Sequence, residues 1–326
     1  IKKLKKEFNQ NTYNEIISKL SFKLTNDQIL ALDEINKDLK SNRKMFRLLQ
    51  GDVGCGKTLV ALIASTNVVI SGFQVSFMAP TEILAKQHYE LAKKLLNKNL
   101  KLSLLTSKTN NQERKIILSK LKNNQVDIIF GTHSLFQQKI EYKKLGLIVI
   151  DEQHKFGVKQ RKKLSDKGGK NCDILVMSAT PIPRTMIMTI FGDMDTSIIK
   201  NKPKNRKNVL TYSKPDTKIN EVLSFIKKQI KNNNQVFWVC PLIEESKKVD
   251  HQSAVKRYED LKNIYNDKVG LIHGSLNAED KNKILLDFLK KKISILVSTT
   301  VIEVGIDFPN ANTIIIENSN KFGLSQ

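Results

Sequence analysis

Residues 51–58 read GDVGCGKT, and this stretch decides the fold. A short apolar run, residues 46–50, precedes it, and a helix-like apolar run, residues 59–65, follows it. Binding of a nucleoside triphosphate requires a glycine-rich loop between a strand and a helix, because the N–H groups of the loop and the positive end of the helix dipole both face the phosphates. The pattern predicts a phosphate-binding loop, with a chance glycine-rich turn as the alternative.

Individual residues of this loop have distinct expected roles. Gly51, Gly54 and Gly56 let the backbone curl around phosphate groups. Lys57 is long enough to reach the outer phosphates, and the hydroxyl of Thr58 is a ligand for Mg²⁺. ATP and Mg²⁺ are therefore the predicted cofactors.

A second motif reinforces the first. Residues 145–154 read LGLIVIDEQH, a nearly unbroken apolar run that ends in two adjacent carboxylates and, two residues later, a histidine. Such a run is typical of a buried parallel strand, and ligands of parallel sheets bind beyond the carboxyl ends of the strands. We expect Asp151 to hold Mg²⁺ across the nucleotide from Thr58, and Glu152 to orient and deprotonate the attacking water. Taken alone, the two carboxylates would indicate an ordinary strand-end turn.

The charge of the chain favours a polyanionic partner. The 326 residues carry a net charge of +23, and nucleic acid is the first candidate partner for such a protein. Lysine supplies nearly all of the basic charge, and lysine spread over a surface is often only a solvated face. The charge by itself leaves both interpretations open.

Other features narrow the class of protein. The sequence contains no apolar stretch of membrane-spanning length, and residues 1–10 lack the apolar core of a signal peptide, so we expect a soluble cytoplasmic protein. Cys55, Cys172 and Cys240 lie far apart and form no C-x-x-C pair. Neither a disulfide framework nor a zinc site is predicted.

Short apolar runs alternate with helix-period segments, which predicts an α/β fold with mainly parallel sheets. In the first part the predicted strands are residues 74–79, 102–105, 126–130, 147–150 and 174–177, and one predicted helix covers 81–96. In the second part we expect strands over 209–212, 236–240, 269–273, 293–298 and 313–316, helices over 219–231 and 279–290, and a charged helical insertion after residue 244.

The predicted domain organisation has four parts. Residues 1–24 form a lead-in helix or linker, residues 25–200 a first ATP-binding lobe, residues 201–208 a polar linker and residues 209–326 a second lobe. The second lobe has no phosphate-binding loop of its own. This organisation suggests a two-lobed motor with ATP in the cleft.

Further strings lie where such a motor would need them. The amide of Gln28, donor and acceptor at once, suits the edge of adenine. Residues 79–82 (APTE) and 131–133 (GTH) offer hydroxyls and helix N-termini to the phosphates of a nucleic-acid backbone. Ser178 and Thr180 can link the nucleotide state to the other lobe. Each string alone is more often a capped helix or a turn, and it is their ordered occurrence that favours a function.

Because these motifs occur together and in this order, the chain resembles superfamily 2 helicases. The longer strings behind the resemblance are MAPTEILAKQHY, GTHSLFQ, DEQHKFGVKQR, SATPIPRT, WVCPLIEES and TTVIEVGIDFPNA. The resemblance covers the chain from about residue 22 to its end. Within the superfamily the strings favour the helicases that remodel branched DNA, and the nearest alternative is the transcription-repair coupling translocase.

The resemblance implies two RecA-like P-loop lobes, the second truncated, in a motor that moves on double-stranded DNA by hydrolysing ATP. Its expected substrates are stalled replication forks and Holliday junctions, in recombination and repair, and a monomer is favoured. The resemblance also implies roles for single residues: Gln28 contacts adenine, His154, Ser178 and Thr180 couple the lobes, Thr132 and Arg184 lie near the DNA path, and Gly305 and Asp307 complete the nucleotide cleft.

The chain departs from the family pattern in two respects. The family continues past a GLxQ string into a segment with arginine fingers, and it has an N-terminal wedge domain, so an incomplete motor is expected here. Cys55 stands where the family commonly has a small residue, often serine. Two other classes stay open, namely an ATP-binding module that does not move on DNA and a motor that binds RNA.

Overall fold

The computed structural model describes residues 3–8, 14–20, 22–136, 140–151, 169, 171–179, 194–201, 209–241, 247–299 and 306–321. By its internal contacts the chain divides into two units, Ile1–Lys207 and Asn208–Gln326. The described part contains no helix that combines the length and the apolar character needed to cross a bilayer.

The first unit alternates helices with strands. The helices are α1 (Asn14–Ser18), α2 (Asn26–Lys40), α3 (Lys57–Ile70), α4 (Glu82–Leu95) and α5 (Asn111–Lys122). The strands are β1 (Phe46–Gly51), β2 (Gln74–Met78), β3 (Leu102–Leu105), β4 (Ile128–Gly131), β5 (Leu145–Ile150), β6 (Asp173–Ser178) and β7 (Asp195–Ile199).

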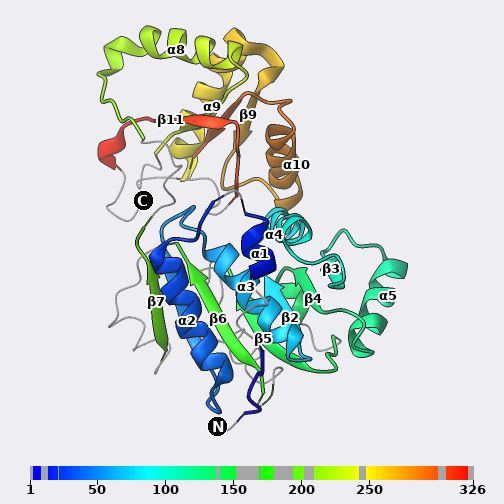
Figure 1. Cartoon of the computed structure of the whole chain (residues 1–326). Helices are drawn as coiled ribbons and strands as arrows, with labels where there is room; N and C mark the ends of the chain where they lie inside the picture. Colours follow the sequence, from blue (N-terminus) through cyan, green and yellow to red (C-terminus); the bar gives the residue numbers. More distant parts are fainter. Residues whose placement is uncertain are drawn as a thin grey trace. The chain divides into compact units, whose positions relative to one another are not determined.

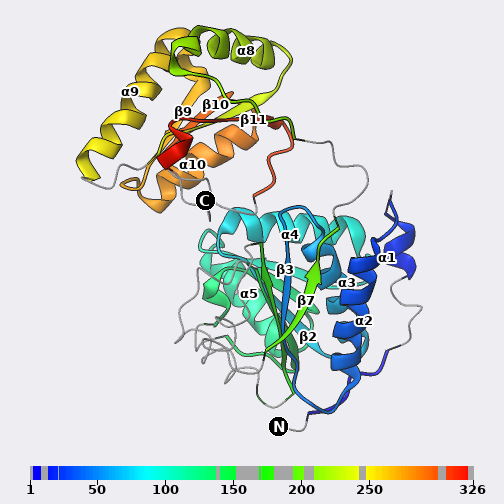
Figure 2. The same ribbon diagram turned by 90° about the vertical axis from the view of Figure 1, so that its left-hand side faces the viewer.

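These strands form one parallel sheet in the order β3-β4-β2-β5-β6-β1-β7 (Figure 1). β6 is hydrogen-bonded to β1 on one side and to β5 on the other, so it joins the two halves of the sheet. Figure 2 shows α2 and α3 on one side of the sheet and α5 on the other. Every carboxyl end in a parallel sheet faces the same edge, which is where ligands of such sheets bind.

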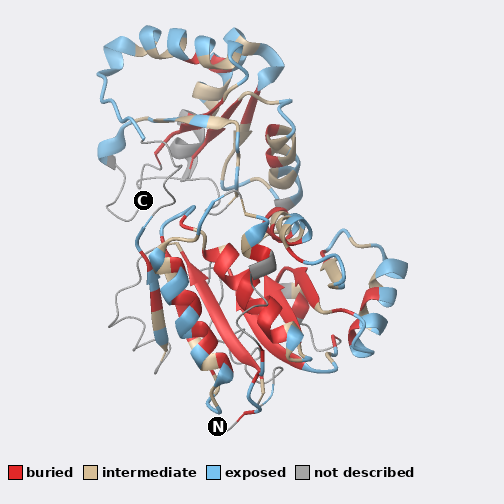
Figure 3. Ribbon diagram, in the orientation of Figure 1, coloured by how far each residue is buried: buried red, intermediate tan, exposed pale blue. Residues whose placement is uncertain are grey.

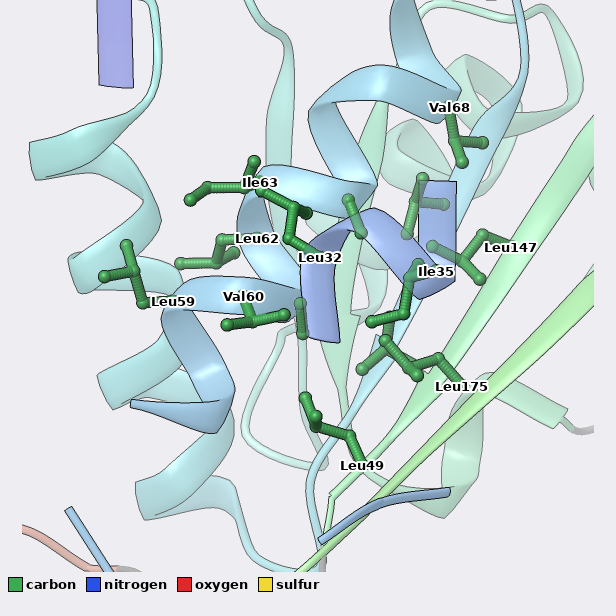
Figure 4. Packing of buried hydrophobic residues seen from close by; sticks show 14 of the residues in the cluster. Leu32, Ile35, Leu49, Leu59, Val60, Leu62, Ile63, Val68, Leu147 and Leu175 are labelled. Atoms are coloured by element: carbon green, nitrogen blue, oxygen red, sulfur yellow. The ribbon is translucent and has the colours of Figure 1, made fainter. Parts of the chain in front are cut away.

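The sheet of the first unit has a core on each face, because successive side chains of a strand point to opposite faces. Leu49, Leu147 and Leu175 lie in the core that includes α2 and α3 (Figure 4). Leu48 and Ile148, one residue away, lie in the other core, which includes residues of α5. The central strands β2, β4, β5 and β6 are therefore wholly buried (Figure 3). Each leucine or isoleucine buried in this way stabilises the fold by about 1.5–3 kcal/mol.

Side-chain caps determine where the helices that flank the functional edge begin. Thr25 Oγ1 accepts the N–H of Gln28 at 3.3 Å, while Gln28 Oε1 accepts the N–H of Thr25 at 2.9 Å, so a reciprocal capping box starts α2. Thr81 Oγ1 accepts the N–H of Leu84 at 3.3 Å and starts α4. Both caps bind helix N–H groups that would otherwise lack a partner.

The second unit is a smaller parallel sheet with helices. Its strands have the order β11-β8-β10-β9. The elements are α8 (Ile219–Lys231), β8 (Gln235–Val239), α9 (Lys247–Tyr265), β9 (Val269–Ile272), α10 (Ala278–Leu289), β10 (Ile295–Ser298) and β11 (Ala311–Ile316). Trp238 of β8 is fully buried in its core and donates from Nε1 to Glu317 Oε1 at 2.8 Å.

Two short segments differ from the sequence-based prediction. Residues 209–212 were predicted as a strand and do not form one: Val209, Leu210 and Tyr212 are 83%, 75% and 77% exposed. A run of suitable residues forms a strand only when a neighbouring strand pairs with it, and none does here within the described residues. Conversely, β7 was not predicted, because its sequence DTSII is largely polar. In the structure only Ser197 and Ile199 of this strand are buried.

A buried ion cluster fastens the N-terminal segment to the amino end of β6. Lys3 Nζ and Lys6 Nζ donate to Asp173 Oδ2 at 2.7 and 2.6 Å, and all three side chains are 0% exposed. The N–H of Met45 donates to Asp173 Oδ1 at 2.7 Å. Burial lowers the pKa of Lys3, and the charge of Asp173 opposes that shift. A single carboxylate thus compensates two buried ammonium groups.

Asp173→Asn is expected to destabilise the first unit by about 3–5 kcal/mol, because it leaves two buried cations without their anion. The midpoint of urea denaturation measures the effect. Glu141→Gln is the matched control, since Glu141 pairs with Lys122 at 2.7 Å where both side chains are more than 60% exposed, and it should hardly move the midpoint. Equal midpoints for the two variants would contradict the assignment of Asp173 as the anchor.

Candidate nucleotide-binding site

Several residues singled out in the sequence lie at one edge of the first sheet. Gly51 ends β1, Ser178 ends β6, Asp151 follows β5 and Thr132 follows β4. The register brings their strands together in order, since Gln50 pairs with Ser178 and Ile150 with Val176. This is the carboxyl edge of a parallel sheet, the usual place for a bound nucleotide.

The loop between β1 and α3 presents backbone donors at this edge. Gly54 and Gly56 have φ angles of +76° and +92°, a left-handed conformation that glycine adopts without strain. Gly56 is the N-cap of α3, and no side chain caps the helix there. The first N–H groups of α3 lie at this end of the helix, where the helix dipole favours an anion.

Lys57 is held close to this loop. Its ammonium donates to the carbonyl oxygens of Gly51 and Asp52 at 2.6 and 3.2 Å, and the residue is only 8% exposed. Phosphate oxygens can replace both carbonyls as acceptors for the same ammonium. Thr58 follows in the first turn of α3 and is partly exposed. The donors, the uncapped helix and the hydroxyl together fit a nucleotide phosphate chain with its metal ion.

Gln28 connects α2 to the loop. Its Nε2 donates to the carbonyl oxygen of Cys55 at 2.7 Å, and the residue is 1% exposed. The approach is so close that a Cβ at Gly56 would lie 2.3 Å from Gln28 Nε2. The adenine contact suggested for Gln28 by the sequence stays a prediction. The sequence did not reveal the hydrogen bond from Gln28 to the phosphate loop.

Asp151 is buried at the end of β5. It is 6% exposed, its N–H donates to the carbonyl oxygen of Met78 at 2.9 Å, and its Oδ2 lies 2.8 Å from His88 Nε2. The sequence-based prediction did not include His88. One signal in the sequence could have indicated it. His88 lies on the same face of α4 as Leu84 and Ala92, and a buried imidazole needs a polar partner.

The thiol of Cys55 is buried inside the loop. Burial raises its pKa, and the charge of Lys57 acts in the opposite direction. Burial likewise raises the pKa of Cys172 and of Cys240, each to about 12. A protonated, inaccessible thiol at position 55 is a small space-filling group.

The remaining predicted residues lie at the carboxyl edge of the first sheet, in the second unit or outside the described part of the chain. Thr132 is buried, and its Oγ1 lies 3.4 Å from Ser134 Oγ. Ser178 is buried, and Asp307 is exposed in the second unit. Five predicted residues lie outside the described part of the chain: Glu152, His154, Thr180, Arg184 and Gly305.

The two halves of the chain match two protein-family descriptions. Residues 25–189 match the DEAD/DEAH box helicase family, and residues 217–325 match the helicase conserved C-terminal domain. A structure of the DEAD-box helicase Mss116 bound to ssRNA shares the fold over 96% of this chain and 70% of that one, with a TM-score of 0.66 at 20% identity.

Relatives over nearly the whole chain are proteins called ATP-dependent DNA helicase RecG. The chain is 49% identical to RecG of Thermotoga maritima over 96% of its length and 44% identical to RecG of Bacillus subtilis over 99%. It spans 40% and 48% of these relatives, so it corresponds to less than half of each. A solved structure of RecG bound to a three-way DNA junction covers 99% of this chain with a TM-score of 0.86 and 43% identity.

Gly56→Ala is expected to lower both the melting temperature and the affinity for ATP. Alanine at positive φ costs about 1–2 kcal/mol, and at position 56 its Cβ would also collide with Gln28. Gly72→Ala is the matched control, because Gly72 has φ +81° but no atom within 4 Å of the added Cβ. Thermal melting and titration with a fluorescent ATP analogue compare the two. The same loss in both variants would show that the Gln28 contact is unimportant.

Proposed function

The chain belongs to the DEAD/DEAH box helicase family, and we propose that it is the motor part of an ATP-dependent double-stranded DNA translocase that remodels branched DNA. The observation behind this proposal is the 43% identity, over 99% of the chain, to a RecG that was solved on a three-way DNA junction. Stalled replication forks and Holliday junctions are the proposed substrates, in recombination and repair. The proposed compartment is the cytoplasm, where such DNA would be met.

The first unit supplies the proposed ATP site. The N–H groups at the start of α3 and the ammonium of Lys57 bind the β- and γ-phosphates, and Thr58 and Asp151 hold the metal ion. Mg²⁺ bound there neutralises charge that develops on the phosphate oxygens. Gln28 braces the loop and is the proposed contact for adenine.

Other residues receive proposed roles from the helicase motifs they occupy. Glu152 is the proposed base for the attacking water. His154, Ser178 and Thr180 are assigned to coupling between the lobes, and Gly305 and Asp307 to the nucleotide cleft. Thr132 and Arg184 are assigned to the DNA path.

Two alternative functions can be distinguished from a DNA translocase by measuring ATP hydrolysis. An ATP-binding scaffold would hydrolyse ATP at the same rate with and without DNA, whereas a translocase is stimulated by duplex DNA. An RNA motor would respond to RNA rather than DNA. The transcription-repair coupling translocase shares several motor strings, but the relatives that match this chain at 41–49% identity are RecG proteins.

Lys57→Ala is expected to abolish ATP hydrolysis in the full-length protein, because Lys57 is the cation placed on the phosphate loop. Lys44→Ala is a control, since Lys44 contacts Gly169 on the protein surface and should leave hydrolysis near that of the parent. DNA-stimulated phosphate release measures both.

Glu152→Gln is expected to retain nucleotide binding and lose turnover, because an amide can position water but cannot accept its proton. Binding of labelled ATP and DNA-stimulated phosphate release separate the two effects. A turnover rate within a few-fold of the parent would show that another group activates the water.

Binding to duplex DNA is expected to weaken steeply with salt, because lysine contacts to phosphates release counterions. The slope of log affinity against log salt should be about −0.9 per phosphate neutralised. Fluorescence anisotropy with unrelated duplexes at several salt concentrations measures both the slope and any sequence preference. Strong discrimination between the duplexes at one salt concentration would count against a translocase.

A further inference from the structure

His88 joins helix α4 to the proposed metal ligand. Its Nε2 lies 2.8 Å from Asp151 Oδ2, and the two side chains are 9% and 8% exposed. A carboxylate has only acceptor oxygens, so the imidazole N–H donates in this hydrogen bond. A hydrogen bond of this length to a buried carboxylate restricts the rotation of that carboxylate.

The imidazole ring is itself held in place. Its centroid lies 5.1 Å from that of Phe77 on β2, and Phe77 in turn lies 5.3 Å from Phe130 on β4. Both phenylalanines are buried. The His88 ring therefore has little freedom to move away from Asp151 without disturbing the core beneath α4.

The helix that bears His88 is fixed at its start. The Thr81 cap holds its first turn, and Glu82 Oε1 accepts the N–H of Ser107 at 2.7 Å and also the hydroxyl of Ser107. Asp151 is fixed from the other side, since its N–H bonds to Met78 at the end of β2. The donor and the acceptor are thus attached to the same rigid sheet.

We propose that His88 is a positioning residue, which engages one oxygen of Asp151 and leaves the other aimed at the metal ion. Among the described residues, no other side chain bonds to this carboxylate. Groups that hydrogen-bond to a metal ligand orient it, and their loss typically weakens metal binding. This role rests on the proposed function only in taking Asp151 as a ligand of Mg²⁺.

Three substitutions at position 88 test the role. His88→Phe keeps a ring against Phe77 but has no donor, and His88→Leu removes the donor with a smaller apolar side chain. His88→Gln can place an amide N–H near the position of Nε2. Tyr89→Phe, at the next residue of α4, is the matched control, because it keeps the aromatic contact with Phe130 and leaves Asp151 untouched.

The first measurement is Mn²⁺ binding to the whole chain with a non-hydrolysable ATP analogue, followed by electron paramagnetic resonance. His88→Phe and His88→Leu should both weaken Mn²⁺ binding by about 10–100-fold, whereas His88→Gln should recover most of the affinity. Binding of the nucleotide without metal should be the same in all variants. In the full-length protein, the donor-free variants should need more Mg²⁺ for half-maximal hydrolysis.

Asp151→Asn separates this role from the proposed function. If Asp151→Asn abolishes Mn²⁺ binding while both donor-free variants bind as the parent does, His88 has no positioning role and the metal site stands. If Asp151→Asn itself binds Mn²⁺ normally, the assignment of the metal ligand is wrong. If His88→Phe binds Mn²⁺ as the parent does while His88→Gln and His88→Leu are weak, the ring acts through packing alone, which also overturns the inference.

Discussion

The parallel direction of every strand in the first sheet is the constraint on which the candidate site depends. Because the strands run the same way, the segments that follow β1, β4, β5 and β6 all emerge at one edge. That edge collects the phosphate loop, Thr132, Asp151 and Ser178, although they are spread over more than 120 residues. A shift of one strand by one residue would exchange the side chains that it gives to the two cores, so the close packing of both cores also holds these functional residues in register.

The first turn of α2 links the phosphate loop to the chain that leaves the sheet. Gln28 bonds to the carbonyl oxygen of Cys55, and one residue earlier Asp27 Oδ2 accepts the N–H groups of Lys200 and Asn201, both at 2.8 Å. Lys200 directly follows β7. The conformation of the loop and the path of the chain after β7 therefore share one support, which begins at the Thr25 cap.

Much of the fold could be predicted because its strands are nearly continuous apolar runs between helix-period segments. Leu102–Leu105 is one strand that the structure reproduces residue for residue. β7 escaped prediction because its stability comes from pairing with β1 rather than from its own composition. In the same way, Asp151 was identified from its place after a strand, but the contact of His88 with Asp151 spans 63 residues and leaves no local pattern. The ion pairs of Lys3 and Lys6 with Asp173 could not be predicted either, because nothing local in the sequence distinguishes these lysines from surface lysines.

The position of β6 between β1 and β5 has a consequence for the order of assembly during synthesis. The ribosome synthesises β1, β2, β3, β4 and β5 before β6, the strand that joins β1 to the rest of the sheet. Lys3 leaves the ribosome 170 residues ahead of Asp173, its carboxylate partner. Closing a loop of that length carries an entropic cost that only the finished sheet offsets. The segment that carries Lys3, although synthesised before the whole sheet, is therefore fastened only after β6 has been made.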